Sequence, residues 1–248
     1  MATNPLHAQL DDLIADVSLT AIVFDRRGNQ IRQVITGGKT HTTFSYPSRR
    51  YRRAQCGDGE TELLIHKVHE VAAATIDFLP QPCRIEGTVG GRPVRAIPDF
   101  AYVAVGEAPV LGEAKSSWAE FERPKARLQQ ALTRKAADAL GWTYKQKTRA
   151  SLGSAEFLAN VDEVQAHRFA HVPLRQEQAA AKALAARRTL TLSEVVAAID
   201  EGPARGRALV CAMMVRRILE IDLHRPLDER SIVRPAPELP FAFPRIRL

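Results

Sequence analysis

The sequence has no long uninterrupted hydrophobic run. A membrane-spanning helix needs about 20 predominantly apolar residues, and no stretch of this 248-residue chain approaches that length. The N-terminal residues, MATNPLHAQLDD, also lack the charged segment followed by an apolar segment that marks a signal peptide. With 45% apolar and 25% charged residues, the composition is that of a globular protein. We therefore expect a cytoplasmic protein that does not bind membranes.

Cysteine is scarce. The three cysteines, Cys56, Cys83 and Cys211, are far apart in the sequence and form no CxxC pair. An odd number of scattered cysteines gives neither a disulfide framework nor the ligand spacing of a zinc site. We expect three reduced thiols. The sequence also shows no internal repeat.

Positive charge is in excess, with a formal net charge of +7. Such a balance favours an anionic partner, most commonly nucleic acid, although it also serves solubility. The densest cluster is SRRYRRAQ, in which Arg49, Arg50, Arg52 and Arg53 flank Tyr51. Guanidinium groups can clamp a phosphate backbone. A solvated loop is the alternative, and the sequence does not separate the two.

Hydrophobic periodicity and turn residues predict an α/β domain in the first 150 residues. Strand pairs followed by a helix and a further strand indicate a mixed sheet with helices packed against it. The expected elements are a helix over 6–17, two strands within 20–38 joined at 27–29, a helix over 60–79, strands over 83–89 and 92–105 joined at Gly90-Gly91, a strand over 110–115, a helix over 118–140 ended by Gly141, and a strand over 142–148.

The composition changes after about residue 172. An alanine-rich polar segment over 171–188 predicts a helix or a semi-rigid connector, and Thr191 and Glu194 have the spacing of a capping box that opens a short helix. A further helix is expected over 208–223, followed by an extended or hairpin tail. This order is typical of a small winged-helix-like domain. We therefore predict two domains, 1–172 with its core at about 45–150, and 173–248.

The stretch IPDFAYVAVGEAPVLGEAK carries the residues most suited to catalysis. Alternate residues of a strand share a face, so Glu113 and Lys115 project together. Asp99 begins the neighbouring run, and the two carboxylates can share a divalent metal ion beside the lysine. Oxygen ligands, including the Ala114 carbonyl, suit Mg²⁺, with Mn²⁺ as a substitute, and suit phosphodiester hydrolysis. A solvated hairpin face is the alternative, but the apolar residues before Glu113 indicate a buried strand.

These residues resemble the PD-(D/E)xK motif of restriction-endonuclease-like nucleases. The wider set YPSRR, GETELL, Gln81-Pro82, IPDF and GEAK is similar to the N-terminal domain of TnsA, the endonuclease subunit of heteromeric transposases. The resemblance covers about residues 45–150, and RRILEIDLHRPLD agrees loosely with the small C-terminal domain of that family. It implies a restriction-endonuclease-like mixed central sheet flanked by helices, with a small C-terminal winged-helix-like domain.

The resemblance also implies roles for single residues. The metal-binding acids fall on Glu62, Asp99 and Glu113, with Lys115 as the catalytic lysine. Glu60 and Glu62 point about 200° apart on a helix, so only one of them can face the site. Glu62 is preferred because it directly precedes two leucines and keeps the family's distance to Gln81-Pro82. Three further residues of the same helix are weaker candidates for binding a metal: Glu70, His66 and His69.

The function implied by the resemblance is cleavage of the 5′ ends of a mobile element in double-stranded DNA. A separate DDE-type transposase subunit and an ATP-dependent regulator are the implied partners. Two alternatives stay open at this point. One is a free-standing nuclease of the same fold from a phage, satellite or defence system. The other is a DNA-binding adaptor that keeps the fold without catalysis.

Overall fold

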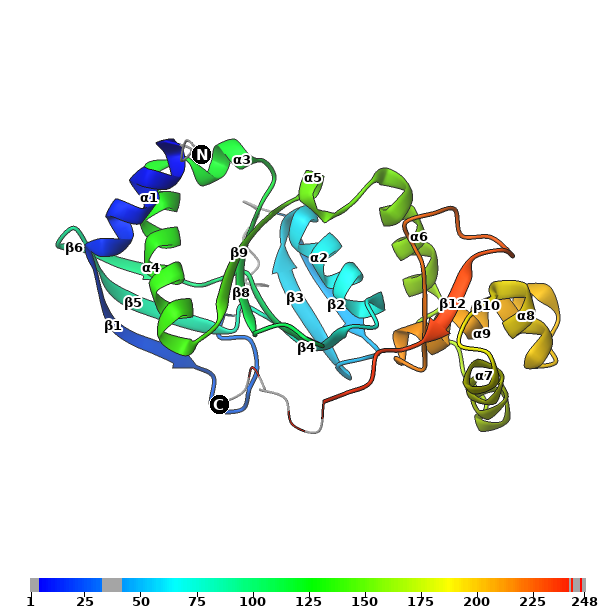
Figure 1. Cartoon of the computed structure of the whole chain (residues 1–248). Helices are drawn as coiled ribbons and strands as arrows, with labels where there is room; N and C mark the ends of the chain where they lie inside the picture. Colours follow the sequence, from blue (N-terminus) through cyan, green and yellow to red (C-terminus); the bar gives the residue numbers. More distant parts are fainter. Residues whose placement is uncertain (1–4, 33–41, 241, 243–245, 247–248) are drawn as a thin grey trace.

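Three antiparallel strands form the first sheet of this mixed α/β structure. The computed structural model describes residues 5–32, 42–240, 242 and 246. Strands β1 (Val17–Phe24), β5 (Cys83–Val89) and β6 (Arg92–Ala96) pair in the order β1-β5-β6. Gly90 and Gly91 have φ of 55° and 74° and form the predicted turn. Helices α1 (Pro5–Ala15) and α4 (Pro124–Leu140) lie over one face of this sheet (Figure 1).

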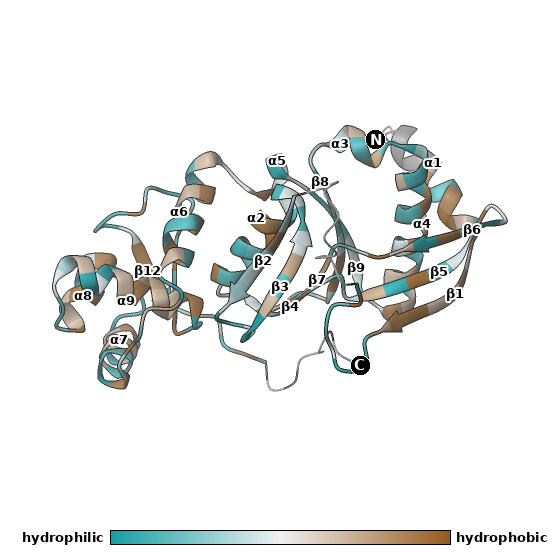
Figure 2. Ribbon diagram, turned by 180° about the vertical axis from the view of Figure 1, so that it is seen from behind, coloured by the Kyte–Doolittle hydropathy of each residue, from teal (hydrophilic) through white to brown (hydrophobic). Residues whose placement is uncertain are grey.

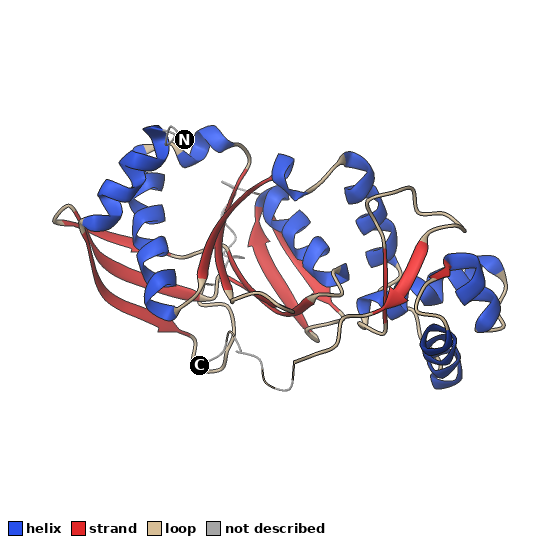
Figure 3. Ribbon diagram, in the orientation of Figure 1, coloured by secondary structure: helices blue, strands red, loops and turns tan. Residues whose placement is uncertain are grey.

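The second sheet is mixed and central. Strands β4 (Thr75–Pro80), β7 (Phe100–Ala104), β8 (Val110–Lys115) and β9 (Thr143–Thr148) pair in the order β4-β7-β8-β9. Strand β8 is antiparallel to β7 and parallel to β9, and α3 (Trp118–Phe121) and α4 connect the parallel pair. The sheet runs between α4 on one side and α2 (Gly59–Val71) on the other (Figure 3). All of β7 and nearly all of β8 are therefore buried.

A hairpin precedes α2. Strands β2 (Thr43–Ser48) and β3 (Arg53–Asp58) pair antiparallel, and the arginine cluster lies in and beside their turn. This hairpin was not expected from the sequence, which favoured a loop. The predicted strand before it lies mostly at residues 33–41, outside the described residues.

The C-terminal elements share an apolar core of their own at one end of the molecule (Figure 1). The strands β10, β12 and β11 form a small antiparallel sheet in that order. This core also takes in Val161 and Val164 of α6, which precede the predicted domain boundary at 172. The elements of this part are α6 (Ala155–Ala166), α7 (Leu174–Ala186), β10 (Leu190–Thr191), α8 (Leu192–Ala198), α9 (Pro203–Val215), β11 (Leu219–Ile221) and β12 (Ile232–Pro235). The short helix α5 (Arg149–Leu152) precedes them and packs on α2 and β9.

Several local predictions are confirmed and several are wrong. The Thr191 capping box opens α8, and Gly141 ends α4 in the left-handed conformation. The helix predicted over 60–79 ends at Val71, because Thr75–Pro80 pairs with β7 as a strand. The helix predicted over 208–223 ends at Val215, and Leu219–Ile221 is a strand.

Two other boundaries differ from the sequence pattern. The run predicted as one strand over 92–105 is split at residues 97–99, and its halves join different sheets. The helix predicted over 118–140 is interrupted before Pro124, which takes the first turn of α4. Both breaks lie next to proline, which restricts the preceding residue and donates no backbone hydrogen bond.

Hydrophobic segments are short and distributed through the core, as the brown strand β1 in Figure 2 illustrates. Within the described part of the chain, no helix has the length and apolar character to cross a membrane.

Candidate active site

Backbone hydrogen bonds fix Asp99 in the break between β6 and β7. The Asp99 N–H donates to the Gly112 carbonyl at 3.0 Å, and the Gln81 N–H donates to the Asp99 carbonyl at 3.0 Å. The Asp99 Oδ2 atom accepts a hydrogen bond from the Ala114 N–H at 2.7 Å. Gln81 reaches this position with φ of 43°. Asp99 is therefore joined both to the Gln-Pro pair and to the strand that carries Glu113.

Glu113 and Lys115 lie near the end of β8, on the side of the sheet that faces Asp99. The Lys115 Nζ atom is 3.5 Å from Asp99 Oδ2 and donates to the Ala114 carbonyl at 3.0 Å. Glu113 is 5% exposed, and its Oε1 accepts a hydrogen bond from the Thr133 hydroxyl of α4 at 2.9 Å. Ala114 packs on the other side of the sheet, against the cluster that contains Ile65 and Phe78.

Glu62 enters the site from the first turns of α2. Its Oε2 accepts a hydrogen bond from the Asp58 N–H at 3.2 Å, and Asp99 and Lys115 both act on its pKa. Gly57 gives it space, since a Cβ at that residue would lie 2.7 Å from Glu62 Oε2. Glu60 is exposed and pairs with Arg149. Of the two neighbouring acids, Glu62 is thus the one that approaches Asp99.

The electrostatics of the site are those of several carboxylates sharing one ammonium group. Burial and the Asp99 charge raise the pKa of Glu62 to about 8 and that of Glu113 to about 7. Burial also raises the pKa of Asp99, despite the nearby Lys115. Burial lowers the pKa of Lys115, but Asp99 and Glu113 outweigh it and leave the pKa raised. The lysine is therefore charged. Its charge does not offset the cost of burying the ionised carboxylates, since the pKa values of all three stay raised.

Three residues contribute to the site without having been predicted from the sequence. Thr133 holds Glu113, as described above. The Asp58 carboxylate raises the pKa of Glu62 and pairs with Arg32 at 3.3 Å. Arg32 lowers the pKa of Asp99. No sequence signal distinguished them, because Thr133 is one hydroxyl on the polar helix α4, whereas Asp58 is the N-cap residue of a different helix, α2.

The weaker metal candidates on α2 do not join this cluster. Glu70 accepts hydrogen bonds from the Ser48 hydroxyl at 2.6 Å and from the backbone N–H groups of Arg49 and Arg50. His66 is 2% exposed and lies among Phe44, Tyr46 and Phe78. His69 stacks on Phe78 and Tyr102. Burial lowers the pKa of both histidines to about 3, so both are neutral packing residues.

The four predicted DNA-contacting arginines have different surroundings. Arg50 donates to the carbonyls of Val215, His69, Ala72 and Thr75, and Arg53 donates to Gly28. Arg49 is partly buried and Arg52 is exposed, and no side-chain hydrogen bond holds either among the described residues. Arg50 therefore serves the fold, whereas Arg49 and Arg52 are available for a ligand.

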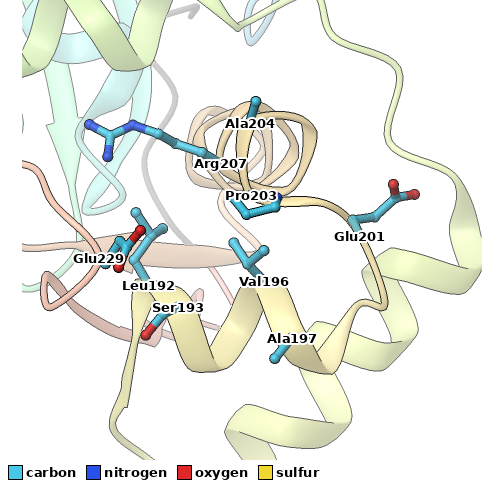
Figure 4. A pocket seen from close by; sticks show the side chains of 9 residues that line it. All are labelled: Leu192, Ser193, Val196, Ala197, Glu201, Pro203, Ala204, Arg207 and Glu229. Atoms are coloured by element: carbon cyan, nitrogen blue, oxygen red, sulfur yellow. The ribbon is translucent and has the colours of Figure 1, made fainter.

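One cavity lies away from the carboxylates. It has a volume of about 520 Å³ and lies between α8 and α9 in the C-terminal part (Figure 4). Its walls are mostly apolar, and Arg207 at its edge is already paired with Glu163 at 2.6 Å. The chemistry of the molecule therefore centres on the carboxylate cluster and not on this cavity.

Comparisons with known proteins identify no family for the chain. No protein-family model matches the chain, and no curated protein matches it either.

The residues at the cluster are chemically suited to a hard divalent cation. All the side-chain donors are carboxylate oxygens, as Mg²⁺ prefers. Their raised pKa values mean that burial makes the ionised carboxylates unfavourable, and a bound cation would offset that cost. No group of three His, Cys, Asp or Glu side chains in the described parts of the chain is arranged as a ready metal site. Instead, the Lys115 ammonium lies between Asp99 and the Ala114 carbonyl.

Proposed function

We propose that the chain is a metal-dependent endodeoxyribonuclease of the PD-(D/E)xK type. The observation that carries this proposal is the convergence of Glu62, Asp99, Glu113 and Lys115 from α2, the β6–β7 break and β8. A buried cluster of carboxylates around one lysine is unfavourable for stability. Such groups are characteristic of functional sites, where pKa values are shifted by burial and neighbouring charge.

The arrangement of strands and helices supports the same proposal. A mixed sheet with β8 parallel to β9, helices on both faces and the acids near the end of β8 agrees with a restriction-endonuclease-like core. The C-terminal helices with the small sheet β10-β12-β11 agree with a winged-helix-like module. Both assignments belong to the proposal and rest on topology together with the motif residues.

Each residue of the cluster has a distinct role in phosphodiester hydrolysis. Glu62, Asp99, Glu113 and the Ala114 carbonyl would hold Mg²⁺, or Mn²⁺ in its place. When bound, the cation lowers the pKa of a coordinated water and offsets charge on the phosphate. Lys115 places its ammonium where the phosphate oxygens gain charge, which stabilises the transition state. Thr133 fixes the Glu113 carboxylate.

The biological role we propose is that of a TnsA-like subunit, which cleaves the 5′ ends of a mobile element. Its partners would be double-stranded DNA, a DDE-type transposase subunit and an ATP-dependent regulator. The motif residues support this role over that of an inactive adaptor, because the acids and the lysine are all present together. A free-standing nuclease with the same site would show the same chemistry without these partners.

A cleavage assay separates these roles. Plasmid DNA carrying the ends of the proposed mobile element is incubated with Mg²⁺ and the protein, with and without the transposase and regulator subunits that we propose as partners. The TnsA-like role predicts cleavage at the 5′ ends that requires the partners and is lost in Asp99→Asn. Equal cleavage without partners and without end preference would assign a free-standing nuclease. The absence of cleavage under both conditions would refute the enzymatic proposal.

A further inference from the structure

A hollow of about 290 Å³ lies where the hairpin turn meets the C-terminal core. Arg49, Arg50 and Arg52 of the β2–β3 turn form one wall, and Arg216 and Arg217 at the end of α9 form another. Five guanidinium groups thus meet from segments more than 160 residues apart in sequence. We call this feature the arginine hollow.

The positive charge of the arginine hollow is poorly balanced by protein groups. Glu177 of α7 is the one acidic residue among its lining residues. Among the described residues, none of the five arginines has a carboxylate within ion-pair distance. The charge of Glu70 is nearby but is engaged by Ser48 and the backbone of the turn. Unpaired cationic groups in a partly buried hollow are suited to an external anion.

The arginines divide into structural and available groups. Arg50 is held by four carbonyls, and Arg217 donates to the carbonyls of Ala73 and Pro237. Arg216 donates to Ala170 through Nη2, whereas its Nε is buried without an acceptor among the described residues. Burial and the Arg49 charge lower the pKa of Arg216. Arg49, Arg52 and Arg216 are therefore the groups that an anion would satisfy.

We propose that the arginine hollow binds backbone phosphates of the DNA, away from the cleaved bond. This inference rests on the proposed nuclease function and names a contact that both structural parts make together. Guanidinium groups match phosphate geometry and remain charged when buried. Helix α2 links the two places. Glu62 and the carbonyl of Ala72 that holds Arg50 are ten residues apart, roughly 15 Å along a helix. That is about four nucleotides of one strand of B-DNA.

Salt dependence of DNA binding gives a direct test. Dissociation constants for a 30-base-pair duplex are measured between 50 and 200 mM KCl without divalent metal, for wild type and the double variant Arg49→Gln/Arg52→Gln. If each arginine neutralises one phosphate, the slope of log affinity against log salt falls by about 2. Arg216→Gln, from the other wall, should lower the slope by about 1. Glu177→Gln, which removes the hollow's carboxylate, should strengthen binding several-fold.

The matched control removes the same charge elsewhere. Arg175 and Arg188 are exposed residues of the C-terminal part, and Arg175→Gln/Arg188→Gln should change the slope by less than about half of one unit. Equal slopes for the two double variants would overturn the proposal, since net charge alone would then account for binding. Wild-type protein that binds no duplex would overturn it as well. Thermal unfolding of each variant shows whether the fold is retained.

Inorganic phosphate separates a small ligand from DNA. One outcome would assign the hollow to a small anion and refute the DNA proposal. In that outcome, phosphate raises the melting temperature of wild type but not of Arg49→Gln/Arg52→Gln, and the two proteins show the same slope of log DNA affinity against log salt. Plasmid nicking in Mg²⁺, measured separately with and without the proposed transposase and regulator subunits, reports the nuclease function. A wild type that nicks DNA, combined with an unchanged slope in the double variant, refutes the arginine hollow alone. A wild type that binds through the hollow but never nicks refutes the nuclease alone.

Discussion

Replacing Glu113 by Gln should stabilise the metal-free protein while removing its activity. The pKa of Glu113 is raised to about 7, against about 4.3 in an unfolded chain. The folded state therefore binds its proton more tightly than the unfolded state does. The stability that this proton gives is present at low pH and is lost as the pH rises through 7. Wild type should consequently carry its full penalty at pH 8.

The expected magnitude follows from the size of the shift. Each pKa unit corresponds to 1.36 kcal/mol, so the neutral amide should gain about 3.5 kcal/mol at pH 8 and about 1 kcal/mol at pH 5. Partial loss of the hydrogen bond from Thr133 would subtract about 1 kcal/mol at both pH values. The gain at pH 8 should therefore exceed the gain at pH 5 by about 2.5 kcal/mol, whether or not that bond is lost.

Urea unfolding in EDTA at pH 5 and pH 8 measures this difference directly. Glu60→Gln is the matched control, because Glu60 is exposed, and its free energy of unfolding should change by no more than about 0.5 kcal/mol. Adding Mg²⁺ should then stabilise wild type more than Glu113→Gln. A Glu113→Gln variant no more stable than wild type at pH 8 would show that the carboxylate is not held in an unfavourable charged state.

Other perturbations test separate parts of the structure. Lys115→Met should reduce Mg²⁺-dependent nicking by about 10²–10³-fold, and unchanged nicking would exclude Lys115 from catalysis. Thr133→Val should lower nicking and destabilise the fold by about 1–3 kcal/mol, because Glu113 loses a buried partner; equal activity at every pH would argue against a positioning role. Arg50→Met should destabilise by about 3 kcal/mol or more in urea unfolding, since four carbonyls lose their donor, and a neutral effect would contradict its structural role. The pKa of His66 is about 3 in the folded protein and about 6.5 in the unfolded chain, so wild type should lose about 2 kcal/mol of stability through His66 when the pH falls from 7 to 5. His66→Phe should not show this loss. Parallel pH profiles of the two proteins would contradict that assignment.

The sequence predicted some parts of the site from local periodicity. Alternation along β8 indicated that Glu113 and Lys115 share a face, and the structure places both beside Asp99. The helical phase of α2 showed only that Glu60 and Glu62 point apart. The preference for Glu62 came from the two leucines that follow it and from the resemblance, through its distance to Gln81-Pro82.

Features that depend on distant partners could not be predicted. Residues 75–80 continue an apolar helical pattern, and only pairing with β7 makes them a strand. The structural role of Arg50 requires the end of α9, 165 residues away in sequence. Thr133 becomes a site residue because α4 packs against β8. In each case tertiary contact, and not local propensity, determines the outcome.

The most direct test of the central claim is nicking of supercoiled plasmid with Mg²⁺ or Mn²⁺ by wild type, Asp99→Asn and Glu60→Gln, in the presence of the transposase and regulator subunits that we propose as partners. Asp99→Asn keeps the size of the side chain and an oxygen to accept the Ala114 N–H, so a loss of activity would report the lost charge. Our account predicts metal-dependent cleavage by wild type and Glu60→Gln, and none above background by Asp99→Asn. Equal cleavage by all three proteins, or cleavage in EDTA, would contradict it.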